Sequence, residues 1–208
     1  MSTDDRYRIT DLAELEALYG APGEASIRKE VDHLAPVYRA IVEASPFAVL
    51  ATSGPGGLDA SPRGDPAGFV HVVDVHTLML PDRRGNNRID SLRNVLADPR
   101  VALLFFVPGV GETLRVNGRA VVSVAPDLLA RFEVGGALPR SVLVIHIDTV
   151  FFQCSRALLR AGLWQPRPPA EPRPVPTPGV MLDALSGASI DAATYDRDLP
   201  ARVASTLY

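Results

Sequence analysis

Residues 101–124 read VALLFFVPGVGETLRVNGRAVVSV, and this stretch decides the expected fold. Its first part, 101–107, is a continuous apolar run with the length of a buried strand, and Pro108-Gly109 then predicts a turn. Its second part, 114–124, is rich in valine and predicts another strand. Asn117-Gly118 lies inside that second run and fits either a hairpin turn or a bulge in a continuous strand.

Shorter runs of the same kind lie on both sides of this stretch. Strands are predicted over 47–52, 58–61, 69–75, 77–80 and 141–152, and the first two flank the turn signal Gly54-Pro55-Gly56-Gly57. One short helix is expected over 90–97, with Asp90 as its N-cap and Ile89, Leu92 and Leu96 on its inner side. Another follows Pro126 and runs to about residue 132. Six or seven short strands with few helices favour a mainly β, antiparallel barrel over a parallel sheet.

Helical patterns precede the predicted strands. Asp11 and Glu14 form a candidate capping box for a helix that stops at Gly20. A second stretch begins near Ser26 and carries one apolar stripe of Ile27, Val31, Leu34, Tyr38 and Ile41. Pro36 interrupts that stretch, so a new helix is expected to begin there.

The last region differs in composition. Residues 154–163 are helical in pattern and end at Trp164, and seven prolines then lie between Pro166 and Pro178, where an extended segment is expected. Helical character returns at 180–185 and 199–207. We therefore expect one domain with extensions: an N-terminal helical segment (1–45), a barrel (46–165) and a proline-rich arm with a tail (166–208).

Composition excludes several classes of protein. The chain has 208 residues, 47% of them hydrophobic, and a net charge of −3, so it has no strong field to hold nucleic acid or an anionic membrane. Its apolar runs are too short to span a bilayer, and the polar segment 1–8 is not a signal peptide, so we expect a cytoplasmic protein. One cysteine excludes an internal disulfide and any multi-cysteine zinc site.

Common catalytic signatures are missing. Gly109-Val110-Gly111 has leucine where a dinucleotide fingerprint needs its third glycine. The four histidines show no metal-ligand spacing, so no metal site is expected, and Cys154 is expected to be a buried structural thiol. The serines lack a nucleophile-elbow context, so no hydrolase triad can be argued.

Arginines gather instead beside glycine, asparagine and hydroxyl groups. One patch is Ser61-Pro62-Arg63-Gly64-Asp65, and another is the sequence PDRRGNNR at 81–88, directly before the helix expected at Asp90. Because a helix N-terminus favours an anion, Arg88 or Arg84 together with Arg63 would be able to clamp a phosphate. The alternative is a solvated loop between a strand and a helix.

The order of these motifs resembles a known family. Residues 80–88 (LPDRRGNNR), 98–105 (DPRVALLF) and 114–120 (LRVNGRA) are similar to the pyridoxamine 5′-phosphate oxidase-like flavin-binding proteins. The closing stretch 154–164 (CSRALLRAGLW) resembles a subgroup of FMN-dependent proteins of undefined substrate. The resemblance covers roughly residues 40–165.

The resemblance implies a split β-barrel homodimer that holds FMN in clefts between its subunits. It implies that Arg63 and Arg88, with Arg84 and Asn87, grip the phosphate, that Thr113 lies near the flavin ring, and that Arg160 and Trp164 reach the cleft. The full set of flavin-binding residues that it implies is Arg63, Pro81, Asp82, Arg84, Asn87, Arg88, Ser91, Thr113, Arg160 and Trp164.

The chain also departs from the family. Pyridoxine-phosphate oxidases end with a Trp-x-x-x-Arg-x-His pattern, whereas here Trp164 is followed by Gln165-Pro166-Arg167-Pro168 and by no later histidine. We therefore expect an FMN-dependent oxidoreductase, with a nicotinamide as candidate electron donor, that does not oxidise pyridoxamine phosphate. The alternatives are a flavin carrier or sensor without turnover, and an enzyme with a deazaflavin or haem in the same cleft. The proline-rich arm suits exchange with a second copy or a simple flexible tail.

Overall fold

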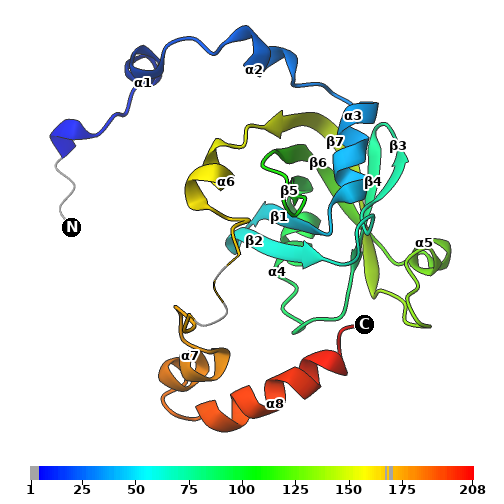
Figure 1. Ribbon diagram of the computed structural model, residues 1–208. Coiled ribbons are helices and arrows are strands. Elements are labelled where there is room, and N and C mark those ends of the chain that lie inside the picture. Colours follow the sequence, from blue (N-terminus) through cyan, green and yellow to red (C-terminus); the bar gives the residue numbers. More distant parts are fainter. Residues whose placement is uncertain (1–4, 167, 169–170) are drawn as a thin grey trace.

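The computed structural model describes residues 5–166, 168 and 171–208 (Figure 1). Residues 1–4, which open the segment judged not to be a signal peptide, lie outside the described residues. So do Arg167, Pro169 and Ala170 of the proline-rich segment. In the part described, no helix is both long enough and apolar enough to cross a membrane.

A seven-stranded antiparallel sheet forms the body of the molecule, as the sequence predicts. Its strand order is β2-β1-β5-β6-β7-β4-β3, and it is the open, split form of an antiparallel barrel with β2 and β3 at its two edges. The strands are β1 (Phe47–Gly54), β2 (Gly57–Gly64), β3 (His71–Asp74), β4 (Thr77–Asp82), β5 (Arg100–Phe106), β6 (Thr113–Ser123) and β7 (Ser141–Gln153).

Strand alternation places the main core on one side of this sheet, and a smaller buried cluster of Met79, Phe132 and Val142 lies apart from it. Along β5, Val101, Leu103 and Phe105 are buried while the residues between them are half-buried. The core is closed by Tyr38 and Val42 from α3 (Pro36–Ala44) and by Val95 from α4 (Asp90–Ala97). The sheet and these two helices therefore share one hydrophobic core.

Asn117 and Gly118 lie inside a continuous strand and not in a hairpin turn, and they face a bulge in β7 whose extra residue is Asp148. β6 runs through both residues, and its register with β7 shifts between them: Asn117 pairs with Thr149, whereas Gly118 pairs with Ile147. Only a glycine fits at this position, because a Cβ on residue 118 would lie 2.2 Å from the carbonyl oxygen of His146.

The helices that begin at Leu12 and at Pro36 start where the sequence predicts, whereas the helical stretch expected from near Ser26 is limited to Glu24–Arg28. In α1 (Leu12–Tyr19) the Asp11 side chain caps the amides of Ala13 and Glu14, and Gly20 ends the helix. α2 (Glu24–Arg28) follows, and α3 begins at Pro36. The predicted apolar stripe is buried only in part: Leu34 and Tyr38 enter the core, but Ile27 is exposed, because α2 lies on the arm that leaves the sheet domain (Figure 1).

The sequence-based prediction for α4 is wrong in two respects: Asp90 is not its N-cap, and Ile89 and Leu96 are exposed instead of lying on the inner side. Ile89 occupies the N-cap position and Asp90 the first helical position, and the buried residues are Ser91, Asn94 and Val95, while Leu96 is 79% exposed. The reason is polar: Asn94 Nδ2 donates to Thr52 Oγ1 (3.1 Å) and to the Gly57 carbonyl oxygen (3.3 Å), which fixes the rotation of the helix.

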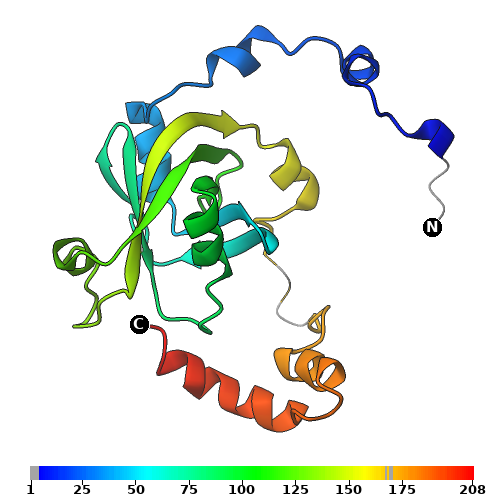
Figure 2. The same cartoon turned by 180° about the vertical axis from the view of Figure 1, so that it is seen from behind.

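The remaining helices are α5 (Pro126–Ala130), α6 (Arg156–Ala161), α7 (Pro178–Leu185) and α8 (Ala192–Ala204), preceded at the N-terminus by a 3-10 turn at Asp5–Tyr7. Cys154 is exposed at the end of β7, so the expectation of a buried thiol is wrong: the strand ends at Gln153 and leaves the cysteine outside the core. In both views the N-terminal arm and the α7–α8 hairpin lie on opposite sides of the sheet domain (Figure 2).

Tyr208 joins the α7–α8 hairpin to the sheet domain. Its hydroxyl donates to Asp65 Oδ1 (2.7 Å), and its ring lies 5.4 Å from the guanidinium carbon of Arg83. The hydrogen bond to Asp65 raises the pKa of Tyr208 above its usual value of 10.

Because the folded pKa is the higher one, the contribution of this contact is complete below pH 10 and is lost as the pH rises through the raised pKa. We expect the absorbance difference between wild type and Tyr208→Phe to titrate at a midpoint above pH 10. A midpoint at or below pH 10 would contradict the docked position of Tyr208.

Candidate functional site

A small cavity opens between β2 and the end of β4, at the open side of the barrel. Its volume is about 220 Å³, and its lining brings together four of the residues predicted from sequence, Arg63, Pro81, Asp82 and Arg84. The other lining residues are Pro62, Gly64, Phe69, Arg83 and Gly85.

Arg63 is half-buried on β2 and is held at both ends of its guanidinium. Nη1 donates to the Pro62 carbonyl oxygen (3.0 Å), and Nη2 donates to Ser91 Oγ (3.1 Å). Ser91 is 4% exposed in the first turn of α4. The Arg63–Ser91 hydrogen bond therefore joins β2 to the first turn of α4.

Asp59 extends this contact and was missed in the sequence analysis. Ser91 Oγ donates to Asp59 Oδ2 (2.5 Å), and Ser61 Oγ lies 3.0 Å from each carboxylate oxygen of Asp59. A signal was present: Asp59, Ser61 and Arg63 are two residues apart along one strand, so their side chains share one face.

Asp82 places a carboxyl group in the same cavity. Burial raises its pKa, and the positive charges of Arg63 and Arg140 act in the opposite direction. The cavity thus holds one carboxyl group, which burial makes easier to protonate, against the guanidinium groups of Arg63, Arg83 and Arg84.

The guanidinium of Arg83 is already bonded to other groups of the protein. Its Nε pairs with Asp65 Oδ2 at 2.8 Å, its Nη1 donates to the Phe132 carbonyl oxygen at 2.6 Å, and the Arg83 and Asp65 side chains are only 17% and 4% exposed. Arg84 is exposed, and no hydrogen bond or ion pair is recorded for its side chain among the residues that the structure describes. Of the two adjacent arginines, Arg84 is the one able to turn toward an anion.

Arg88 lies outside this cavity. It pairs with Asp90 (Nη2 to Oδ2, 2.9 Å) and lines a neighbouring cavity of about 510 Å³, which also contains Asp59, Arg93 and Asn94. Asn87, in the left-handed region with φ of 62°, accepts a hydrogen bond from Arg140 Nη1 (2.8 Å). The polar wall formed by Asp59 and α4 separates Arg88 from Arg63.

Thr113 lies at the start of β6, and Arg160 and Trp164 lie in α6 and shortly after it. Gly64, Phe47, Phe106 and Thr113 are successive partners across β2, β1, β5 and β6, so three strand spacings, about 14 Å, separate Gly64 from Thr113. Trp164 Nε1 donates to the Val110 carbonyl oxygen (2.7 Å), which holds the end of α6 beside the loop before β6. None of these three residues lines the cavity of Arg63.

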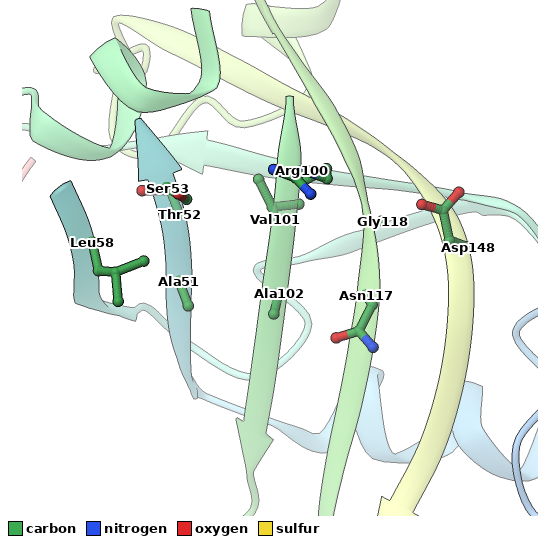
Figure 3. A pocket seen from close by; sticks show the side chains of 10 residues that line it. All are labelled: Ala51, Thr52, Ser53, Leu58, Arg100, Val101, Ala102, Asn117, Gly118 and Asp148. Atoms are coloured by element: carbon green, nitrogen blue, oxygen red, sulfur yellow. The ribbon is translucent and has the colours of Figure 1, made fainter. Parts of the chain in front are cut away.

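A wider hollow of about 480 Å³ lies over the middle of the sheet (Figure 3). Figure 3 shows Leu58 of β2 at one side and Asp148 of β7 at the other, with Arg100 and Asn117 between them. Arg100 is paired with Asp98 (2.6 Å), and Asp148 lies 3.7 Å from Arg119. The charged residues of the hollow therefore already have partners of opposite charge. None of its residues was predicted as functional.

One of the four histidines, His71, packs against an aromatic ring. His71 stacks on Phe132, with ring centroids 4.0 Å apart, and burial lowers its pKa, helped by Arg131 and Arg83. Within the described ranges no group of three histidine, cysteine, aspartate or glutamate residues is arranged to hold a metal ion.

Comparison with known families fits this arrangement. The model of the family described as pyridoxamine 5′-phosphate oxidase matches residues 34–154, which include both arginine patches and β1 to β7. The chain belongs to this family. The match to the family ends at Cys154, so α6, the proline-rich arm and the α7–α8 hairpin lie beyond it.

Several solved structures resemble this member of the family in fold. HupZ of Group A Streptococcus is 16% identical with a TM-score of 0.48, over 58% of this chain and 94% of that one. General Stress Protein 26 of Bacillus anthracis is 18% identical, with a TM-score of 0.41 and coverages of 55% and 88%. An FMN-binding protein of Syntrophomonas wolfei is 9% identical, with a TM-score of 0.41 and coverages of 68% and 95%. A search of curated proteins found no match.

Proposed function

We propose that this chain binds FMN, with the phosphate in the cavity between β2 and β4, and acts as an FMN-dependent oxidoreductase. The observation that carries the proposal is the convergence of Arg63 and Arg84 in that cavity. Membership of the pyridoxamine 5′-phosphate oxidase family supports it. A planar guanidinium fork matches the oxygens of a phosphate, and a half-buried position strengthens each contact.

The residues present fit a phosphate monoester. At about 220 Å³ the cavity has room for a phosphate and the adjoining part of the ribityl chain, and the adenylate of FAD would have to extend outside it. Its arginines supply donors for the phosphate oxygens, and burial raises the pKa of Asp82 while the charges of Arg63 and Arg140 act in the opposite direction. FMN is therefore expected to bind in preference to FAD.

Bound FMN would supply the electron transfer, and the protein would bind it, orient it and exclude water. Arg63 and Arg84 would hold the phosphate. Pro81 and Asp82 would form the wall beside it. Asn87 and Arg88 would set the shape of the loop that leads to α4, through their bonds to Arg140 and Asp90.

A homodimer would complete the ring side of the site. Phe47, Val49, Leu104 and Phe106 form a half-exposed apolar face on β1 and β5, and Phe47 is 39% exposed. Thr113, Arg160 and Trp164 do not line the cavity that contains Arg63. We propose that two copies pair over this face, so that a flavin at their interface reaches both groups.

The test is a titration of the purified protein with FMN, riboflavin and FAD, followed by fluorescence quenching. We expect FMN to bind at least about a hundredfold more tightly than riboflavin, which lacks the phosphate, and FAD to bind more weakly than FMN. Equal binding of FMN and riboflavin would contradict the phosphate site. Repeated reduction of the bound FMN by NADH or NADPH would support the oxidoreductase over a carrier or sensor without turnover.

A further inference from the structure

We infer that Asp59 is a positioning residue which, through Ser91, holds the guanidinium of Arg63 toward the cavity. The inference rests on the proposed function, because it assigns the support of the proposed phosphate site. Asp59 itself does not line the cavity that contains Arg63 and Arg84.

The directions of the hydrogen bonds show how Arg63, Ser91 and Asp59 are linked. An ionised carboxylate only accepts, so the single hydroxyl proton of Ser91 goes to Asp59 Oδ2, at 2.5 Å. The guanidinium of Arg63 only donates, so its Nη2 uses a lone pair of the same Ser91 oxygen, at 3.1 Å. The chain of donors therefore runs from Arg63 through Ser91 to Asp59.

This direction changes the role expected of Ser91. Its only proton is already given to Asp59, so Ser91 has none to offer to a phosphate oxygen. Ser91 thus serves as a link between Asp59 and Arg63, while the guanidinium itself keeps further N–H groups for the anion.

The link is anchored on rigid elements. Asp59 is on β2, two residues from Ser61, whose hydroxyl also bonds its carboxylate. Ser91 is on α4, which is fixed to the sheet by the bonds of Asn94 to Thr52 and to the Gly57 carbonyl. A long arginine side chain loses rotamer freedom when it binds a ligand, and holding it beforehand reduces that loss.

Asp59→Asn and Ser91→Ala test the inference. Each is expected to weaken FMN binding about tenfold, the effect of one charge-assisted hydrogen bond, and to leave riboflavin binding unchanged. The double variant is expected to weaken FMN binding no more than either single variant, because both remove the same link. Asp148→Asn and Ser123→Ala are matched controls on β7 and β6, away from the cavity, and are expected to change neither affinity.

A second measurement does not involve flavin. In the ligand-free protein, the NMR order parameter of the Arg63 Nε–H bond is expected to fall in Asp59→Asn and in Ser91→Ala, and to stay constant in both controls. Unchanged order would overturn the inference while leaving the proposed function standing.

The binding results also distinguish a failure of the role inferred for Asp59 from a failure of the proposed FMN site. Equal losses for FMN and riboflavin would mean that Asp59 only supports the fold, and stronger FMN binding by Asp59→Asn would mean that its charge repels the phosphate. Either result overturns the inference. A wild-type protein without preference for FMN over riboflavin would overturn the proposed function and the inference together.

Discussion

Replacement of Arg63 by alanine is expected to lower the affinity for FMN at least about a hundredfold and to leave riboflavin binding unchanged. Arg63 and Arg83 are the half-buried cations of the cavity, and Arg83 is already paired with Asp65. Two charge-assisted hydrogen bonds from Arg63 to a phosphate contribute about 3 kcal/mol together. The measurement is fluorescence quenching of each flavin by the wild-type and variant proteins. Arg63→Lys is expected to lie between them, because lysine keeps the charge but loses the planar fork.

Arg119→Ala is the matched control for Arg63→Ala. Arg119 lies on β6 beside Asp148 and lines neither arginine cavity. A hundredfold loss in both variants would point to damage of the sheet, and no loss in Arg63→Ala would remove the phosphate site from this cavity. Arg84→Ala is expected to have a smaller effect than Arg63→Ala, because its exposed side chain is screened by water.

Gly118→Ala is expected to destabilise the protein by about 3 kcal/mol or more. The added Cβ would meet the backbone carbonyl of His146 at 2.2 Å, so β6 and β7 would have to separate at the bulge. Denaturant unfolding followed by circular dichroism measures the change. Gly56→Ala is the control, because nothing lies within 4 Å of a Cβ there. A loss below about 1 kcal/mol for Gly118→Ala would show that the strands move apart easily.

The strands could be predicted because their signals are local. The apolar runs at 101–107, 114–124 and 141–152 correspond to β5, β6 and β7, and the helix starts at Asp11 and Pro36 follow from side-chain caps and proline geometry. The conformation of Asn117-Gly118 could not be predicted in this way, because the same two residues fit a hairpin turn and a bulge in a continuous strand equally well. Only the partner strand, β7, distinguishes a bulge from a turn.

The failures have a common cause in long-range polar contacts. Leu96 fits an apolar stripe, yet Asn94 is buried in its place because Thr52 and Gly57 supply hydrogen-bond partners from another part of the chain. The adjacent Arg83 and Arg84 look alike in sequence, and they differ because Asp65, Phe132 and Tyr208 all contact Arg83. Asp59 could have been found from strand alternation, but its partner Ser91 is 32 residues away.

The two edges of the sheet protect the protein against aggregation. An uncovered edge offers free backbone groups to any passing strand, so long flat edges tend to polymerise. Here the edge strand β2 carries Pro62 between Asp59 and Arg63, and β3 is only four residues long with an irregular register against β4. Proline and charge both discourage strand addition. Growth into a continuous fibril is thus blocked at both ends of the sheet, and contacts between copies are directed to its faces.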